Sequence, residues 1–390
     1  MIRILVVSLV TLLSACDSPS IETRTEPSFS IIQINNASTP NLFNDEQGGL
    51  LSYQRTAHSE TELVVGHIDN QGVLTEQVVA RGNDWFVNWA DFPAISRNGD
   101  HIVTWYLKKH DEGTYSYNIW LVQSFDNGAT WQSPTQLNND NSGGEHGFAD
   151  IIPLGDSFLI SWLDGRNTVG RHGAHSGSMM VNWAIINSDG SVDSNETLDT
   201  RSCDCCHTAL ASVDGTPMLA YRDRSEEEIR DIAISRWNGT EFTDSAPWHQ
   251  DNWQISGCPV NGPSVIDSQG EAALAWFTQA TGTSELQFKV AGSPPITLSN
   301  TTLGRIDALQ HGRYSFISHL SNAADSDPSV DIIRLDSTDH SSKPTTFSIT
   351  ESSAQRASGI PRMAIINEEL WIAVTGEEGI SLYHSGDALR

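Results

Sequence analysis

One short phrase recurs seven times along the chain: a bulky apolar residue, a small residue and then usually an aromatic one. Its third position is occupied in turn by Tyr53, Trp105, Trp162, Tyr221, Trp276, His319 and Val374, at intervals of 43 to 59 residues. Self-similarity with a period of this length, carried by short strands, is typical of a propeller or a repeat array. The repeat constrains the fold more than any other feature, because it decides which loops meet in space.

Each repeat can be divided into four strands separated by turns. The second repeat shows this best, with strand-like segments at Phe92–Ser96, His101–Tyr106 and Tyr117–Ser124 before a polar stretch. Turn residues such as Asn98 and Gly99 separate the segments, and helical periodicity is nearly absent. Four-stranded units around a central axis are propeller blades. The sequence therefore predicts an all-β fold, a β-propeller of four-stranded blades.

The last repeat shows only three strands, at Pro361–Ile366, Leu370–Val374 and Ile380–His384. A spare strand at the start of the chain, Phe29–Ile34, is free to complete it and close the ring, which would leave no strand edge unpaired. Seven repeats predict seven blades, and six remain an alternative if the outermost repeats merge.

The N-terminus has the features of an export signal. Arg3 supplies a positive charge, and Ile4–Leu13 is an apolar run too short to span a bilayer. The segment Leu13-Ser14-Ala15-Cys16 resembles a bacterial lipobox, in which the cysteine is lipidated; a simple cleaved signal is the alternative. We expect residues 1–16 to be a lipoprotein signal peptide, residues 17–27 a polar tether and residues 28–390 the propeller. The protein would be anchored in the cell envelope through Cys16 alone, facing the periplasm or the exterior.

The formal net charge of -27 argues against nucleic acid or anionic lipid as a partner. Much of this charge would keep an exported protein soluble, and we expect a monomer. A glycan or another small acidic ligand is compatible with local basic groups on such a surface.

Four cysteines remain when Cys16 is set aside, and three of them are crowded into one segment beside a histidine. The candidate metal ligands are Cys203, Cys205, Cys206, His207 and Cys258. Cys258 occupies the corresponding place in the next repeat, so one interpretation has two disulfides, one to Cys258 and one within the cluster. A soft-metal site for copper or zinc is the second interpretation, because thiolates and imidazole favour these ions. A redox-active thiol pair is the third.

Guanidinium and carboxylate groups gather at the predicted mouth of adjacent blades. The candidate catalytic residues are Asp164, Arg166, Arg222, Asp223 and Arg224. Arginine binds carboxylates through paired hydrogen bonds, and two neighbouring carboxylates can serve as acid and base in glycoside cleavage. The alternative is a solvated ion-pair network with the acidic residues of the segment Glu226–Asp231.

The segment Ser124–Trp131 matches the Asp-box pattern S-x-D-x-G-x-T-W in full, and Ser235–Phe242 is a degraded copy. The chain therefore resembles the sialidase superfamily and the wider set of Asp-box (BNR-repeat) propellers. The resemblance implies a sialidase-like propeller and, for an enzyme, a glycoside hydrolase of the exo-α-sialidase type. The Asp-box itself implies a turn between the outer strands of a blade, away from the active centre.

The chain departs from true sialidases at the catalytic positions. Ser38–Asn41 stands where they carry an arginine before Ile-Pro, and the late tyrosines Tyr314 and Tyr383 both look like strand residues without a glutamate partner. Three hypotheses follow. The first is a glycan-directed protein, either a divergent exo-glycosidase or a carbohydrate binder. The second is an envelope metal or thiol-redox protein built on the cysteine cluster. The third is a scaffold that docks another protein.

Overall fold

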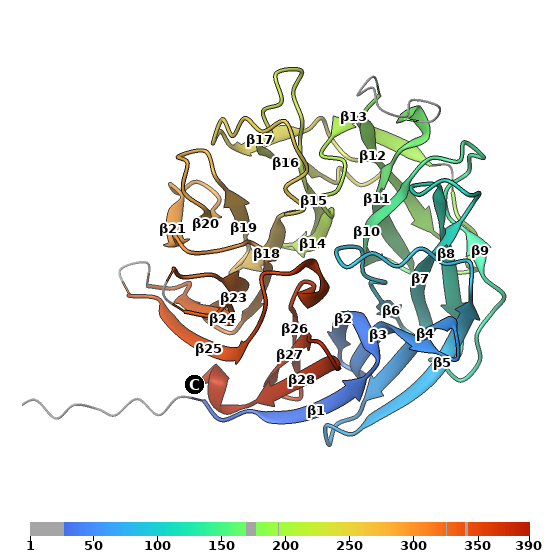
Figure 1. Cartoon of the computed structure of the whole chain (residues 1–390), viewed down its shortest axis with the longest axis horizontal. Coiled ribbons are helices and arrows are strands. Elements are labelled where there is room, and N and C mark those ends of the chain that lie inside the picture. Colours follow the sequence, from blue (N-terminus) through green and yellow to red (C-terminus); the bar gives the residue numbers. More distant parts are fainter. Residues whose placement is uncertain (1–26, 169–176, 194, 325, 340–341) are drawn as a thin grey trace, which may run out of the picture.

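The computed structural model describes residues 27–168, 177–193, 195–324, 326–339 and 342–390. Seven four-stranded antiparallel sheets are arranged in a ring, as Figure 1 shows. The predicted all-β propeller is confirmed, with seven blades rather than six. The signal peptide, the tether as far as residue 26 and Cys16 lie outside the described residues.

Blade 1 contains β2 (Ala37–Asp45), β3 (Gly48–Ala57), β4 (Glu60–Ile68) and β5 (Leu74–Gly82). Blade 2 contains β6 (Ser96–Asn98), β7 (His101–Lys109), β8 (Tyr117–Ser124) and β9 (Thr135–Gln136). Blade 3 contains β10 (His146–Leu154), β11 (Ser157–Asp164), β12 (Met179–Ile186) and β13 (Glu196–Ser202). Blade 4 contains β14 (Ala209–Val213), β15 (Thr216–Arg222), β16 (Ile232–Arg236) and β17 (Ala246–His249).

Blade 5 contains β18 (Ser264–Ser268), β19 (Glu271–Thr278), β20 (Glu285–Val290) and β21 (Ile296–Ser299). Blade 6 contains β22 (Asp307–His311), β23 (Tyr314–Ser321), β24 (Ser329–Asp336) and β25 (Thr345–Glu351). Blade 7 contains β26 (Arg362–Ile366), β27 (Glu369–Thr375), β28 (Gly379–Ser385) and, as its outer strand, β1 (Ser30–Asn35). Three short 3₁₀ turns complete the described elements: η1 (Arg166–Thr168), η2 (Arg356–Ser358) and η3 (Asp387–Leu389).

The first and last segments of the described chain close the ring. Strand β1 pairs antiparallel with β28, from Ser30 opposite His384 to Asn35 opposite Gly379. The predicted closing strand is therefore confirmed. The described part of the chain has no helix with the length and hydropathy that a membrane crossing requires.

The recurring phrase lies on the second strand of every blade. Its third residue is at most 4 % exposed in all seven blades. Alternation along a strand turns the first and third residues of the phrase to one face of the sheet and the small residue to the other. Because the flanking blades cover both faces, each large side chain is buried, which contributes about 1.5–3 kcal/mol per residue.

Side-chain oxygens on or next to the inner strands link neighbouring blades at five of the seven blade boundaries. Asp150 accepts a hydrogen bond from the backbone N–H of Leu210 at 2.7 Å, and Asp307 accepts one from Met363 at the same distance. Asn41, Asp91 and Asn261 make the corresponding bond to their next blades. These bonds satisfy backbone donors beside the axis that no strand partner reaches.

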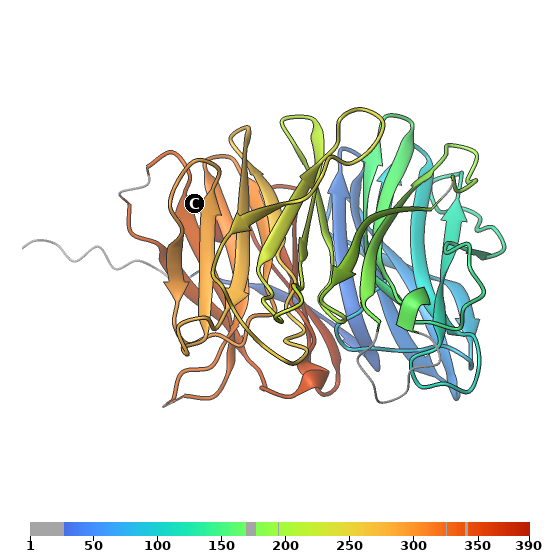
Figure 2. The same cartoon turned by 90° about the horizontal axis from the view of Figure 1, so that it is seen from above.

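The strands run roughly along the ring axis, so the connections collect on two opposite faces, as Figure 2 shows. Connections between the third and fourth strands lie on one face. There Asp126 accepts hydrogen bonds from the backbone and hydroxyl of Thr130 at 2.8 and 2.6 Å, which closes the turn of Ser124–Trp131. That position agrees with the Asp-box resemblance, while membership of that family stays a prediction. The opposite face, called the site face below, carries the connections from the second to the third strand and from each blade to the next.

Candidate functional site

The loops that carry the candidate residues meet in pairs on the site face. The backbone N–H of Gly165 donates to the carbonyl oxygen of Glu145 at 2.7 Å, so the loops entering and crossing blade 3 touch. A Cβ atom on Gly144 would lie 2.6 Å from the carbonyl oxygen of Gly165, and this close approach therefore requires glycine. In blade 4, Cys203 donates its N–H to the carbonyl oxygen of Arg222 at 2.9 Å.

Asp164 and Arg166 form a bidentate pair at the end of β11. The Nε and Nη2 atoms of Arg166 donate to the two carboxylate oxygens of Asp164 at 2.8 and 2.7 Å. Asp164 is completely buried and also accepts bonds from the side chains of Trp162 and Asn182. Burial alone would raise the pKa of Asp164, but the hydrogen bonds from Arg166 and His146 outweigh it and hold that pKa well below its usual value. The carboxylate of Asp164 is fully occupied by protein donors.

His146 lies between two carboxylates beside this pair. Its Nε2 atom is 3.0 Å from Asp140 and 3.4 Å from Asp164, and its Nδ1 atom lies 3.1 Å from the carbonyl oxygen of Tyr117. Burial lowers the pKa of His146, but the hydrogen bonds and charges of the two carboxylates outweigh burial and raise this pKa to about 9. We call the group of Asp140, His146, Asp164 and Arg166 the ion-pair network. It therefore holds two negative and two positive charges at neutral pH.

The structure places Arg222 in the interior of blade 4. Its guanidinium donates to the backbone carbonyl oxygens of Asn261, Arg230 and Phe277 at 2.7 to 2.8 Å, and it lies over the ring of Trp253. Only 1 % of Arg222 is exposed, and burial lowers its pKa to about 10. Arg222 connects blades 4 and 5 and has no surface to offer a ligand, in contrast to its predicted catalytic role.

Arg224, two residues further on, is held by carboxylates instead. Its Nη1 atom is 3.1 Å from Asp204, and its Nη2 atom donates to Glu228 at 2.7 Å. Glu228 also accepts a hydrogen bond from Arg230 at 2.8 Å. The half-buried Asp223 accepts the N–H of Arg224 at 2.6 Å, and burial raises the pKa of Asp223 to about 6. The pair of Arg224 with Glu228 agrees with part of the alternative interpretation, but it is buried rather than solvated, includes Asp204 and leaves out Arg222.

Glu145 directly precedes β10. Among the half-buried carboxyl groups on the described part of the site face, it has the highest pKa. The hydroxyl of Tyr117 donates a hydrogen bond to it. Burial raises the pKa of Glu145 to about 7; the bond from Tyr117 opposes this rise and the charge of Asp204 adds to it. The fully buried Asp91 lies nearby, and burial raises its pKa to about 8. A carboxyl group that titrates near neutral pH is suited to proton transfer.

A tyrosine and a glutamate do pair in this protein, but they are Tyr117 and Glu145, in the first half of the chain, and not the late tyrosines Tyr314 and Tyr383. The ring of Tyr117 stacks on Phe86 with centroids 4.2 Å apart, and none of its surface is exposed. Tyr117 is therefore not accessible as a nucleophile, unlike the activated tyrosine of a sialidase. Glu145 could be placed on this face from its position before an inner strand, but the sequence contains no signal that pairs it with Tyr117.

The cysteine cluster forms two disulfides. Cys203 is bonded to Cys206, and Cys205 is bonded to Cys258 across the boundary between blades 4 and 5. This pairing corresponds to the disulfide interpretation of the sequence. The sulfur of Cys203 lies 3.5 Å from Arg230, in the interior of the same region.

His207 is separated from this cluster by the direction of its side chain. It lines a cavity of about 180 Å³ on the ring axis, together with Asp150, Asp307 and Arg362. Burial lowers the pKa of His207 to about 3, and the charge of Arg362 contributes. Asp307 pairs with Arg362 at 3.4 Å inside this cavity.

A copper or zinc ion does not fit the cluster in its oxidised form. The sulfurs of Cys203, Cys205 and Cys206 lie within 4.8 Å of one another, and His207 is not part of this group. Each of the three sulfurs is engaged in a disulfide, however, and the thiolate is the form that binds a metal. The metal-site prediction therefore concerns only the reduced protein, for which it stays a prediction.

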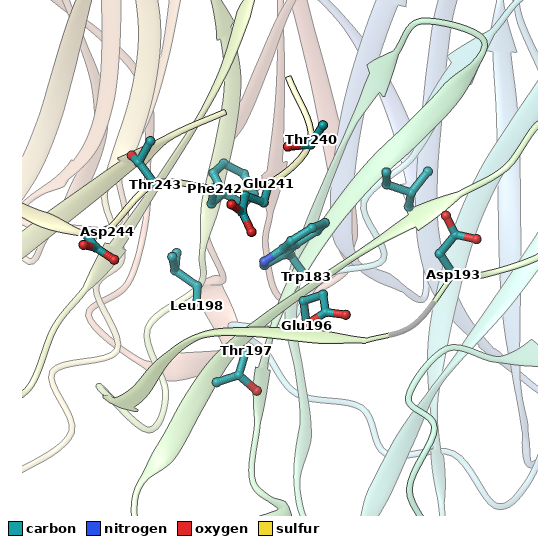
Figure 3. Close-up of a pocket in the computed structure, with 11 residues that line it drawn as sticks. Trp183, Asp193, Glu196, Thr197, Leu198, Thr240, Glu241, Phe242, Thr243 and Asp244 are labelled. Carbon is teal, nitrogen blue, oxygen red and sulfur yellow. The ribbon is translucent and has the colours of Figure 1, made fainter. Parts of the chain in front are cut away.

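A second, larger hollow lies at the outer edges of blades 3 and 4, away from the cysteines. It has a volume of about 500 Å³, and Figure 3 shows Trp183 in its interior with carboxylates around it. Those carboxylates belong to Asp193, Glu196, Glu241 and Asp244. Trp183 is 8 % exposed and packs against Trp237 and Phe242, so it belongs mainly to the core.

No protein-family model and no curated protein matches the sequence. Solved structures with a similar fold include an ulvan lyase of polysaccharide lyase family PL25, with a TM-score of 0.56 and 12 % identity over 90 % of this chain and 94 % of that one. A PL25 ulvan lyase bound to -[GlcA(1-4)Rha3S]- gives 0.52 and 11 % over 90 % and 94 %. The polysaccharide lyase Uly1 gives 0.53 and 8 % over 89 % of both chains. At these identities the likeness extends to the β-propeller fold alone.

Proposed function

We propose that the chain is a glycan-directed enzyme that hydrolyses a glycosidic bond on the site face of blades 2 to 4. The observation that carries the proposal is the state of Glu145. Its carboxyl group is half-buried, accepts a hydrogen bond from Tyr117 and has a pKa of about 7. A carboxylic acid with a pKa raised in this way is the general acid that glycoside cleavage requires.

Asp204 is the second carboxylate of the proposed site. It is half-buried, pairs with Arg224 at 3.1 Å and lies close enough to Glu145 to raise the pKa of that residue. Two carboxyl groups in such different environments support separate roles, with Glu145 as the acid and Asp204 as the base or nucleophile.

The arginines support a neutral glycan rather than the acidic sugar that the sialidase resemblance implies. Arg166 is paired with Asp164, Arg224 with Asp204 and Glu228, and Arg222 is buried against backbone carbonyls. A guanidinium already bound to carboxylates has little charge left for a ligand carboxylate. The similarity to polysaccharide lyases, one of them bound to an oligosaccharide, supports a glycan as the ligand class.

The test is a screen of the oxidised full chain on neutral and uronate-containing polysaccharides. We expect new reducing ends on a neutral glycan without the ultraviolet absorbance of an unsaturated sugar. Glu145→Gln should reduce this turnover by roughly 100-fold or more, the usual contribution of a general acid. Glu241→Gln, which removes a carboxylate of the outer hollow, is the matched control and should leave turnover unchanged.

Three other outcomes would overturn the proposal in different ways. Ultraviolet-absorbing products from a uronate polymer would replace hydrolysis with elimination. Binding on a glycan array without turnover would leave a carbohydrate binder. Neither turnover nor binding would remove the glycan-directed function and favour a docking scaffold.

We also propose that the protein resides in the cell envelope as a lipoprotein anchored at Cys16. The lipobox-like segment before Cys16 supports this, and so do the two disulfides, which persist in oxidising compartments. Metabolic labelling with a fatty acid, compared between the natural chain and Cys16→Ala, tests it. Equal labelling of both chains would contradict the anchor.

A further inference from the structure

The two disulfides of the cysteine cluster differ in access to solvent. Cys203 and Cys206 are 0 % and 1 % exposed, so their disulfide is sealed in the interior. Cys258 is exposed and Cys205 is half-buried. A thiolate in solution can therefore reach the sulfur of Cys258 but not the buried pair.

The accessible disulfide also controls the loop that carries a carboxylate of the proposed site. Asp204 stands between Cys203 and Cys205, and the disulfide from Cys205 ties this loop to the loop that enters blade 5. The backbone bond from Cys203 to Arg222 and the buried disulfide hold the start and end of the turn, and Arg224 holds the carboxylate of Asp204, while Cys205 is held by the outer disulfide. Opening the outer disulfide therefore releases Cys205 and loosens its neighbour Asp204.

We propose that the Cys205–Cys258 disulfide is a thiol-exchange site for a dithiol reductant, and that its reduction loosens Asp204 and lowers activity at the site of the proposed function. The effect of reduction on activity rests on the proposed function, whereas the thiol exchange at Cys205–Cys258 does not.

In the first step, a thiolate of the reductant attacks the Cys258 sulfur, forms a mixed disulfide and releases Cys205 as a thiolate. The second thiol of the reductant then displaces Cys258, which leaves as a thiolate. The reductant departs as a disulfide, having given two electrons, and both protein thiolates take up protons.

The geometry adds a detail that can be tested. The sulfurs of Cys203, Cys205 and Cys206 lie within 4.8 Å of one another. The released Cys205 thiolate is thus close to the buried disulfide and can exchange with it. Cys258 is the constant member of the released pair, while its companion is Cys205 or one of the two buried cysteines.

The first experiment maps the released thiols under native conditions. The oxidised full chain is treated with limiting dithiothreitol, alkylated and digested for mass spectrometry. We expect two alkylated cysteines per chain, one of them always Cys258, with one disulfide retained in the cluster. Release of all four cysteines together, or of a pair without Cys258, would overturn the exchange site.

The second experiment follows the loop and the rate. Hydrogen–deuterium exchange in residues 203–208 should increase on selective reduction, and turnover on the glycan should fall roughly tenfold to a hundredfold, as for a displaced catalytic group. The double variant Cys205→Ala/Cys258→Ala should show the reduced behaviour from the start and should not respond to the dithiol.

These readouts separate the two proposals. Turnover that is the same in both redox forms would overturn the effect of reduction on activity and leave the proposed function standing. Absence of turnover in the oxidised form would overturn the proposed function, and with it the regulation, while thiol mapping and hydrogen exchange would still decide the exchange site.

Discussion

The loop that enters blade 3 (residues 137–145) and the loop that enters blade 4 (residues 203–208) lie side by side and are held by different means. The first is fixed by charge: His146, directly after it, contacts Asp140 and Asp164, and Tyr117 binds Glu145. The second is fixed mainly by two disulfides, and Asp204, which lies between Cys203 and Cys205, also pairs with Arg224. Each loop supplies one carboxyl group to the proposed site.

The difference shows how one site can depend on two independent conditions. A network of buried ion pairs loses stability when one member changes its protonation, because an unpaired charge is left in the interior. A disulfide is insensitive to such changes and responds to thiols instead. The position of Glu145 should therefore depend on pH, and that of Asp204 on the redox state.

The largest effect is expected from Asp164→Ala, which removes the centre of the ion-pair network. Asp164 is completely buried and bound to Arg166 and His146, so its loss leaves Arg166 without its main partner and His146 with Asp140 alone. Breaking a buried pair in this way costs about 3–5 kcal/mol of the free energy of unfolding. Urea unfolding of the oxidised protein measures it.

The matched control for this experiment is Asp84→Ala, because the pair of Asp84 with Lys108 at 3.3 Å lies at the surface. Its cost should stay within about 1 kcal/mol. The disulfide-held loop offers an internal check, since peptide mapping of Asp164→Ala should still find both disulfides. Equal costs for the two variants would mean that the buried network does not fix the first loop.

A smaller effect is expected when the pH is raised. His146 has a pKa of about 9 in the folded chain against an ordinary value of 6.5, so its contribution is complete below about pH 6.5 and disappears as the pH passes 9. A shift of this size corresponds to at most about 3 kcal/mol. The pKa values of Glu145 and Asp91 are raised to about 7 and 8 in the folded chain. Their ionisation therefore also lowers the free energy of unfolding as the pH rises.

Unfolding free energies measured between pH 6 and 9.5 test this expectation. The decline should be shallower in His146→Gln, which cannot ionise. It should keep most of its steepness in Cys205→Ala/Cys258→Ala, which affects the first loop only through the charge of Asp204 near Glu145. A decline as steep in His146→Gln as in the natural chain would assign the pH response to other groups.

The sequence reveals the fold more completely than the site, and the reason is the range of the interactions. The recurring phrase is local, so it predicts each second strand, and the spare strand expected at Phe29–Ile34 predicts closure. The roles of Arg222 and Arg224 depend on distant partners. Two residues apart, one is surrounded by backbone carbonyls of two blades and the other by carboxylates. No local sequence pattern distinguishes the two arginines, because their roles depend on how deeply the fold buries each side chain.

Apart from the surface control Asp84→Ala, the smallest effect expected on stability is that of Tyr117→Phe, which removes the hydrogen bond from Tyr117 to Glu145. The bond from Tyr117 favours the ionised form of Glu145, so its removal should raise the pKa of Glu145 above its present value of about 7. Stability should fall by only about 1–2 kcal/mol, because the ring stays packed on Phe86 and half-buried Glu145 can still reach water. If Glu145 acts as an acid, the decline of kcat/KM at high pH should move to higher pH in this variant, in both redox forms of the second loop. A decline that moves to lower pH, or that moves only in the reduced protein, would contradict the independence of the two loops.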